Sequence, residues 1–312
     1  MIVEMTDIVK RYKELVALDH FNLEVAQGEI FGLLGPNGCG KTTAINCMLS
    51  LTQYESGTVE LFGQPMSGDQ FDLKRRIGLV MQDIGVYETL TVQENIDYFC
   101  GLYISDRKMR QDYVNQAIEF VGLDKFRKFK PDKLSGGLKR RLNLACGVAH
   151  KPDLIILDEP TVQVDSQSRN HIMQGIEALA QEGKTIIYTT HYMEEVERLC
   201  DRLLIMDRGK VLVSGTSEEI KNMSSSGEVV TVEIFEMVDE FKEALHSLPN
   251  VQSFDYQQGK LNVHFSKGES NLIGLIQLIE QYELNMLNIS VQKPNLNDVF
   301  LEITGKELRD NA

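Results

Sequence analysis

The sequence predicts an α/β protein with two domains, and three observations lead to this fold class. From Met1 to about Ser214, short apolar strands alternate with amphipathic helices, as in a sheet covered by helices. One apolar run, residues 30–34, leads into a glycine-rich loop and then into a helical pattern. A small-polar break at residues 223–227 precedes a β-α-β-β-α-β order, which indicates a second, smaller domain.

The strands expected in the first domain follow two patterns. Unbroken apolar runs are typical of a parallel sheet with both faces covered, and they occupy residues 30–34, 77–80, 154–157, 185–188 and 203–206. Apolar and polar residues alternate instead, as in an antiparallel sheet, over residues 2–9, 17–25 and 58–62. We therefore expect a mainly parallel core with an antiparallel β subdomain beside it.

A mostly helical block, residues 88–133, separates two of the core strands. Within it, Thr91-Val92-Gln93-Glu94 has the form of a capping box that opens a helix. The block predicts an inserted helical subdomain over about residues 88–150.

The second domain, residues 228–312, is expected to be a small α+β domain of the split βαβ type. Its predicted elements are a strand at 229–235, a helix at 239–247, a hairpin through 257–260, a helix at 272–282, a strand at 286–292 and a last helix at 296–303.

Composition limits the possible functions. The 312 residues carry a formal net charge of −14, so we expect no nucleic-acid partner. No apolar run is long enough to span a bilayer, and the first residues lack the features of a secretory signal. The five cysteines are widely separated and form no C-x-x-C pair, which favours a reducing cytoplasm over a disulfide or zinc framework.

The glycine-rich loop is the strongest functional signal. Residues 35–43, Gly-Pro-Asn-Gly-Cys-Gly-Lys-Thr-Thr, fit G-x-x-x-x-G-K-[ST] between a strand and a helix. Backbone N–H groups of such a loop bind phosphate, Lys41 would reach the β- and γ-phosphates, and the Thr42 hydroxyl would hold Mg²⁺. The alternative is a glycine-rich turn without a ligand. The loop predicts a P-loop NTPase core, with nucleotide contacts from Asn37, Gly38, Cys39, Gly40, Lys41, Thr42 and Thr43.

Two carboxylates follow the strand at residues 154–157. Asp158 is placed to enter the Mg²⁺ shell beside the glycine loop. Glu159 is placed to polarise an attacking water as general base. The alternative is a strand that ends in acids at the surface.

A second anion-binding terminus is indicated by Ser135, Gly136 and Gly137, which open a helix with free N–H groups and a hydroxyl. One nucleotide needs only one such loop for its γ-phosphate, so we expect this segment to serve a nucleotide held by another subunit. A plain helix N-cap at Ser135 is the alternative.

The glycine loop, the Leu-Ser-Gly-Gly segment and the Leu-Asp-Glu-Pro strand end, in this order and spacing, resemble the nucleotide-binding subunit of an ABC transporter. The resemblance covers about residues 1–220 and identifies residues 1–222 as the nucleotide-binding domain. It implies ATP and Mg²⁺ as cofactors and two ATPase subunits, a homodimer or a pair with a paralogue. The resemblance further implies that these subunits close head-to-tail over two ATP molecules.

The resemblance also implies roles for four further residues. Tyr12 resembles the aromatic that stacks on adenine, although the residues alone favour a tyrosine on the surface of a β-hairpin. Gln82 resembles the glutamine that senses Mg²⁺ and contacts the membrane partner. His191 resembles the histidine that contacts the γ-phosphate, and Asp165 the aspartate at the dimer seam, in the D-loop.

Three positions depart from the family pattern. Gln163 stands in the D-loop where glycine is usual, and Met81 stands before Gln82 where proline is common. The signature continues as Leu138-Lys139 where glutamine is more frequent. None of these departures removes a catalytic group.

A further resemblance suggests what the ATPase drives. Residues 139–145 and 295–305, with the small second domain, resemble the drug-resistance and nodulation-type exporter ATPases that serve ABC-2-type permeases. This implies separate transmembrane permease subunits and a peripheral location on the cytoplasmic face of the cell membrane. The alternative is a soluble or regulatory ABC ATPase that is not coupled to transport. A GTPase would need an Asn-Lys-x-Asp motif, which the sequence lacks.

Cys39 lies inside the glycine loop, near Lys41 and a helix N-terminus. Because both features lower a thiol pKa, we expect alkylation of Cys39 to block ATP binding and ATP to protect it. A small filler residue is the alternative reading.

Overall fold

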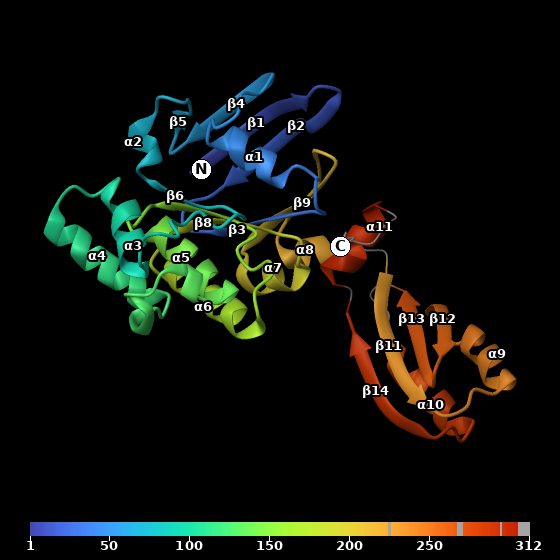
Figure 1. Ribbon diagram of the computed structural model, residues 1–312. Helices are drawn as coiled ribbons and strands as arrows, with labels where there is room; N and C mark the ends of the chain where they lie inside the picture. The colour runs from blue at the N-terminus through green and yellow to red at the C-terminus, as the bar shows by residue number, and fades with distance from the viewer. Residues whose placement is uncertain (224–225, 267–270, 294, 305–312) are drawn as a thin grey trace. The chain divides into compact units, whose positions relative to one another are not determined.

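A computed structural model of the chain describes residues 1–223, 226–266, 271–293 and 295–304 (Figure 1). The chain divides into two compact units, of which the first is Met1–Thr216 and the second begins at Ser217. The division falls earlier than the expected domain end at residue 222. Helix α8 (Ser217–Lys221) accounts for the difference, because it packs against helix α11 (Leu296–Thr304) of the second unit.

The first unit contains two sheets. The antiparallel sheet has the order β2-β1-β4-β5, with strands Leu15–Val25, Val3–Tyr12, Ser56–Leu61 and Gln64–Pro65. The larger sheet has the order β10-β9-β3-β8-β7-β6, with strands Lys210–Gly215, Arg202–Asp207, Ile30–Leu34, Thr185–Thr190, Leu154–Asp158 and Ile77–Val80. All its pairs are parallel except that of the edge strand β10 with β9. The predicted α/β fold, with parallel and antiparallel sheets, is confirmed.

Helix α1 (Lys41–Met48) packs between these sheets. Its buried Ala44 and Ile45 belong to one hydrophobic cluster with Met5 and Leu23 of the antiparallel sheet and Leu33 of β3. The glycine loop, which joins β3 to α1, is therefore anchored at both ends in a packed core.

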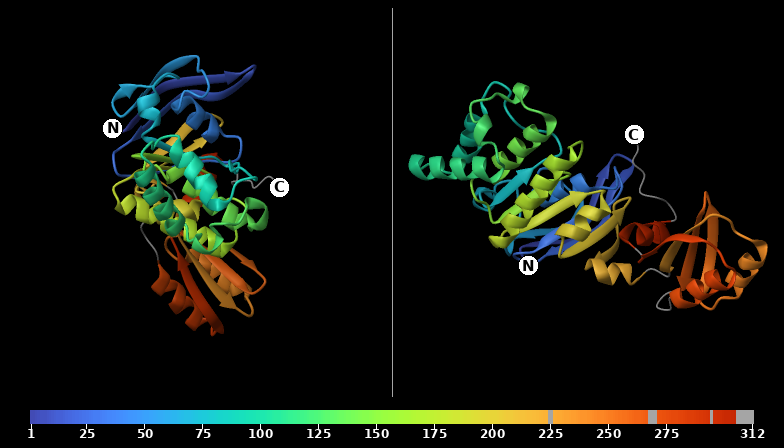
Figure 2. Two further views of the ribbon diagram at one scale, coloured as in Figure 1. Left: turned by 60° about the vertical axis from the view of Figure 1, so that its left-hand side comes forward. Right: turned by 90° about the horizontal axis from the view of Figure 1, so that it is seen from below.

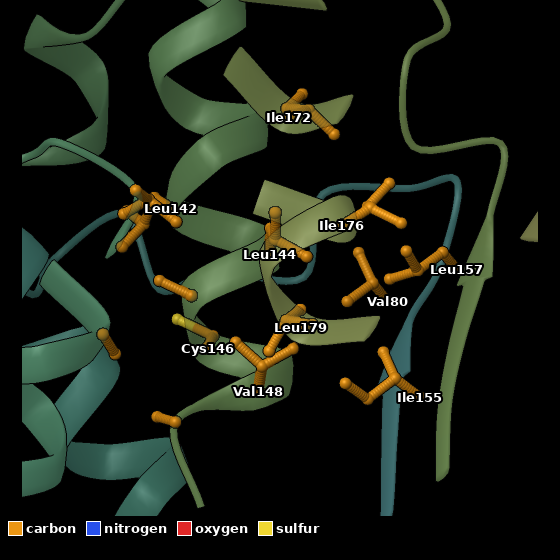
Figure 3. Close-up of a cluster of buried hydrophobic side chains, with 14 of the residues drawn as sticks. Val80, Leu142, Leu144, Cys146, Val148, Ile155, Leu157, Ile172, Ile176 and Leu179 are labelled. Atoms are coloured by element: carbon orange, nitrogen blue, oxygen red, sulfur yellow. The ribbon is translucent and has the colours of Figure 1, made fainter. Parts of the chain in front are cut away.

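Helices cover the opposite face of the larger sheet. Figure 3 shows Leu144 and Val148 of α5 (Gly136–Val148) and Ile176 of α6 (Ser166–Gln181) gathered against Ile155 and Leu157 of β7. Their neighbours on β7, Leu154 and Ile156, belong instead to the cluster around α1. Strand β7 is thus buried on both faces, which explains its unbroken apolar sequence.

The helical block consists of α3 (Val92–Gly101) and α4 (Arg107–Phe120), which pack against each other and against α5 (Figure 2). The predicted capping box is present, because the Thr91 side chain accepts from the Glu94 N–H and the Glu94 side chain accepts from the Thr91 N–H. Shorter helical segments of the first unit are α2 (Phe71–Lys74), α7 (Met193–Leu199) and two 3₁₀ turns, Asp124–Phe126 and Pro131–Lys133.

The second unit has the predicted β-α-β-β-α-β order, with elements β11 (Ser226–Ile234), α9 (Asp239–Ser247), β12 (Val251–Gln257), β13 (Lys260–Ser266), α10 (Leu272–Gln281) and β14 (Met286–Gln292). Its sheet is antiparallel in the order β12-β13-β11-β14. Phe241 and Leu275 of the helices pack on Val230 and Val263 of the sheet. Among the described residues, no helix is both long and apolar enough to cross a bilayer.

Candidate functional site

A cleft of about 690 Å³ opens over the glycine loop, beside the hairpin of β1 and β2. Its lining includes most of the predicted nucleotide contacts, namely Tyr12, Asn37, Gly38, Cys39, Gly40, Lys41, Thr42, Thr43, Gln82 and Glu159. The sequence did not point to its other lining residues, which are Leu15, Val16, Ala17, Arg208 and Gly209.

The glycine loop has the geometry of an anion cradle. Gly40, just before α1, has φ 116°, and a Cβ added there would lie 2.6 Å from the carbonyl oxygen of Ala17. Gly38 has φ 78°, and a Cβ there would meet no atom within 4 Å, so the space above the loop is open. The Lys41 Nζ atom donates to the carbonyl oxygens of Gly35 at 2.8 Å and Pro36 at 3.3 Å, which curls the loop around the ammonium group.

Lys41 and Glu159 form an ion pair at the floor of the cleft. The Nζ of Lys41 lies 3.0 Å from Oε1 of Glu159, and both side chains are 5% exposed. Oε2 of Glu159 lies 3.4 Å from Nδ1 of His191. Burial acts to raise the pKa of Glu159, but the hydrogen bond with His191 and the charge of Lys41 outweigh it and lower the pKa below its usual value. Glu159 therefore carries a negative charge at neutral pH.

The oxygen atoms expected to hold Mg²⁺ converge beside this pair. The Thr42 hydroxyl donates to Oδ2 of Asp158 at 2.8 Å, and the Thr189 hydroxyl donates to Oδ1 at 2.6 Å. Gln82 follows the end of β6 and lines the same cleft. Hydroxyl and carboxylate oxygens are ligands that Mg²⁺ prefers, so this donor set fits the metal.

The backbone at Glu159 is strained. Its φ is 48°, a left-handed conformation that is uncommon for residues other than glycine. Its N–H donates to the Thr189 hydroxyl at 3.0 Å, and Thr189 in turn donates to Asp158. Thr189 of β8 thus contacts both the Asp158 carboxylate and the backbone of Glu159 at the end of β7.

The segment that begins α5 lies apart from this cleft, because Ser135, Gly136 and Gly137 are not among its lining residues. Ser135 caps α5, since its Oγ accepts from the N–H of Leu138 at 3.3 Å. Ser135 and Gly136 are exposed, whereas Gly137 is buried. This exposure is consistent with the expected use of the segment by a second chain.

At residue 163 the D-loop has a backbone conformation that is typical of glycine, although the residue is glutamine. Gln163 has φ 57°, so its backbone is left-handed despite the side chain. Asp165 follows as the N-cap of α6, and its carboxylate accepts from the Ser168 N–H at 2.9 Å. Gln163 therefore adopts a left-handed backbone conformation that glycine adopts at lower cost.

The expectation of a reactive Cys39 thiol is wrong. The side chain is 3% exposed, and burial raises the pKa of Cys39 to about 11. The charge of Lys41 and a backbone hydrogen bond act in the opposite direction but are smaller effects. The alternative, that Cys39 is a small residue that fills space in the loop, fits this buried environment better.

Tyr12 ends β1 at the rim of the cleft, with 46% of its surface exposed and the Lys10 ammonium 4.7 Å from its ring centroid. Arg208 and Gly209 form the turn between β9 and β10, and the Gly209 N–H donates to the Cys39 carbonyl at 2.8 Å. Gly209 could be recognised from the sequence as a turn residue. Its contact with the glycine loop could not, because that contact depends on the pairing of β9 with β3.

Comparisons with known proteins agree with this geometry. A family model described as ABC transporter matches residues 18–162. The linearmycin resistance ATP-binding protein LnrL of Bacillus subtilis is 35% identical over 99% of this chain and 100% of its own length. The Nod factor export ATP-binding protein I of Cupriavidus metallidurans is 33% identical over 99% of each chain. A solved dimeric ATP-binding cassette in a post-hydrolysis state, bound to ADP and Pi, is 27% identical with a TM-score of 0.63. It matches 69% of this chain and 98% of its own.

Proposed function

Because the chain belongs to the ABC transporter family and is an ATPase of that family, we propose that it is the ATP-hydrolysing subunit of a membrane exporter. Two such subunits would close head-to-tail over two ATP molecules and drive a separate transmembrane permease. The observation that carries this proposal is the convergence of Lys41, Thr42, Asp158 and Glu159 at one cleft.

Each of these groups has a role that follows from its position. Lys41 would bind the β- and γ-phosphates from the loop, and His191 would contact the γ-phosphate. Thr42, Asp158 and Gln82 would hold Mg²⁺, which when bound neutralises charge on the phosphates. Glu159 accepts a proton from the attacking water as its general base, and its lowered pKa keeps it ready to do so at neutral pH.

The proposed dimer is supported by the exposed start of α5. Ser135 and Gly136 present a hydroxyl and helix N-terminal N–H groups away from the chain's own cleft. In the head-to-tail arrangement these groups would contact the nucleotide bound by the second subunit. Each ATP would then be held by two chains, so closure depends on nucleotide.

A groove beside Gln82 is the proposed permease contact. It has a volume of about 290 Å³ and lies between β6, the segment that follows it, α3 and α5. Large apolar side chains are exposed around it, namely Ile84, Tyr87, Tyr98, Leu102 and Tyr103. An exposed apolar patch of this kind is typical of a protein interaction site.

The export direction and the location are proposed by analogy with the relatives. Their names refer to linearmycin resistance and to Nod factor export. We infer that this chain acts on the cytoplasmic face of the cell membrane as a peripheral subunit. The cargo would be selected mainly by the permease.

The test is a pull-down of tagged Glu159→Gln chain from detergent-solubilised native membranes in the presence of ATP. A polytopic membrane protein at stoichiometric yield would support the proposal. The matched control is the same variant with Leu102→Glu added, which alters the groove and leaves the nucleotide cleft intact. It should bind ATP normally and lose the membrane partner. Recovery of a soluble dimer alone would instead favour a regulatory ATPase that is not coupled to transport.

A further inference from the structure

The carboxylate of Glu195 is buried and accepts hydrogen bonds from three hydroxyl groups. Glu195 lies on α7, and its side chain is 4% exposed. Its Oε2 accepts from Tyr188 at 2.7 Å, from Thr161 at 2.9 Å and from Thr190 at 3.1 Å. Its Oε1 lies 3.6 Å from Nε of Arg169, on α6. One carboxylate therefore connects the segment that follows β7 with β8, α6 and α7.

The Thr190 branch leads to His191. Thr190 directly precedes that histidine, and its Oγ1 also accepts from the N–H of Tyr192 at 3.0 Å. The Tyr192 N–H, the Thr190 hydroxyl and the Glu195 carboxylate thus form a continuous chain of hydrogen bonds. This chain fixes the backbone on both sides of His191.

The Thr161 branch leads to Glu159. Thr161 is fully buried and lies two residues after Glu159, in the segment that continues to Asp165. Glu159 has the left-handed φ of 48°, and such a conformation persists only where the surrounding contacts hold it. The hydrogen bond from Thr161 to Glu195 anchors the segment that leaves this strained residue.

The Tyr188 branch differs from the other two. Tyr188 lies within β8, whose backbone is held by parallel pairing with β3 and β7. Burial, together with the charge of Glu195, raises the pKa of Tyr188, so the phenol remains a donor. Its hydroxyl contacts the same carboxylate oxygen and lies 3.3 Å from Oγ1 of Thr161, but Tyr188 is adjacent in the sequence to neither catalytic residue.

We propose that Glu195 is a positioning residue for ATP hydrolysis. It holds Glu159 and His191 in their positions relative to each other through the hydroxyls of Thr161 and Thr190. A buried carboxylate is costly, and apolar residues would fill the same space without that cost. Its use here is explained by the need to hold two catalytic segments that come from different strands. The inference rests on the proposed roles of Glu159 and His191.

Three substitutions test the proposal, and each removes one hydroxyl donor from the same carboxylate oxygen. They are Thr161→Val, Thr190→Val and the matched control Tyr188→Phe. We expect comparable falls in melting temperature for all three. ATPase kcat should fall about tenfold in the two valine variants with KM for ATP within about twofold, because small misplacements of catalytic groups reduce rate. Tyr188→Phe should keep kcat within about twofold.

Serine variants at residues 161 and 190 retain the hydroxyl and should restore kcat. Equal kcat losses in Tyr188→Phe and the valine variants would overturn the proposal, as would wild-type kcat in Thr161→Val and Thr190→Val. If the valine variants do not fold, Glu195→Gln and Glu195→Leu decide. The glutamine keeps an oxygen acceptor and should retain most of kcat, the leucine should lose it, and equal kcat in the two would overturn the proposal. Glu159→Gln is measured in parallel. If Glu159→Gln hydrolyses ATP normally, the proposed function of the site is wrong. If Glu159→Gln is inactive but the two valine variants keep wild-type activity, only the proposed role of Glu195 is rejected.

Discussion

The Nζ atom of Lys41 lies 3.0 Å from Oε1 of Glu159. This ion pair joins the cation of the glycine loop to the proposed general base of the same cleft. Phosphate oxygens that bind Lys41 would compete with the Glu159 carboxylate for the same ammonium group. Nucleotide binding would therefore free the carboxylate to act on water, so the pair couples binding to catalysis.

Substituting Glu159→Gln should reduce ATP turnover at least about 100-fold, because a general base contributes about 10²–10⁴ to rate. Nucleotide affinity should stay equal or increase, since the substitution removes a competing negative charge. Single-turnover hydrolysis and equilibrium binding of a fluorescent ATP analogue measure the two effects. Glu182→Gln, at the exposed end of α6, is the control and should change neither. Normal turnover in Glu159→Gln would exclude Glu159 as the base.

The hydrogen bond of Glu159 with His191 and its ion pair with Lys41 make the stability depend on pH. The pKa of Glu159 is lowered in the folded chain, so its contribution to stability is fully present above the ordinary carboxylate pKa of about 4.3. The contribution is lost as the pH falls through the lowered folded value. The difference in unfolding free energy between the wild-type chain and Glu159→Gln should thus shrink as the pH falls below about 4. Denaturant unfolding at several pH values measures it. A difference that grows on acidification would contradict the pairing.

Short apolar runs made much of the fold predictable. Strands β3, β6 and β14 and helix α9 coincide with the predicted residues. Strand β11 begins earlier than predicted, at Ser226, because Ser226 already pairs with Ser266 of β13, before an irregularity in the register that ends at Val229. Local pattern could not show this, because pairing with a distant strand determined it.

The candidate site was less completely predictable. Its loop and carboxylates carry local motifs, but Gly209 and Glu195 reach the site through strand order and helix packing. For Cys39, in contrast, the local sequence led to a wrong prediction of a reactive thiol. Its sequence neighbours lower a thiol pKa, yet burial is the larger effect, and burial is a property of the folded chain.

The raised pKa of Cys39 predicts slow alkylation at neutral pH. With a pKa of about 11, only about one thiol in ten thousand is ionised at pH 7, and the thiolate is the nucleophile. The rate of Cys39 labelling should rise about tenfold per pH unit between pH 7 and 9. Peptide mapping by mass spectrometry separates this residue from the other four cysteines.

The urea-unfolded chain is the reference for this experiment, since its thiols have ordinary pKa values and should react about 100-fold faster at pH 7. The variant Cys39→Ala should bind ATP within about threefold of the wild-type chain, as a filler residue requires. Labelling of the folded chain at the rate of the unfolded chain would show that the thiol is accessible and ionised.

The two glycines that open α5 should respond differently to the same substitution. A Cβ added at Gly137 would lie 2.7 Å from Oδ2 of Asp165 and would also clash with Ser168 at the start of α6. At Gly136, an added Cβ would meet no atom within 4 Å. Gly137→Ala should therefore cost about 1–3 kcal/mol by overpacking, whereas Gly136→Ala should be neutral or gain up to about 1 kcal/mol of helix stability.

Thermal and denaturant unfolding of the two variants measure this difference. ATPase activity is not used as a readout, because both glycines belong to the proposed nucleotide-binding segment. The clash at Gly137 includes the Ser168 hydroxyl, so Ser168→Ala should recover part of the loss in the double variant. Such a recovery would show that the start of α5 and the D-loop are packed as one unit within a single chain. Movement of Asp165 at the proposed dimer seam would then also move the segment that is proposed to bind the second subunit's nucleotide. Equal stability of Gly137→Ala and Gly136→Ala would mean that these two loops adjust independently.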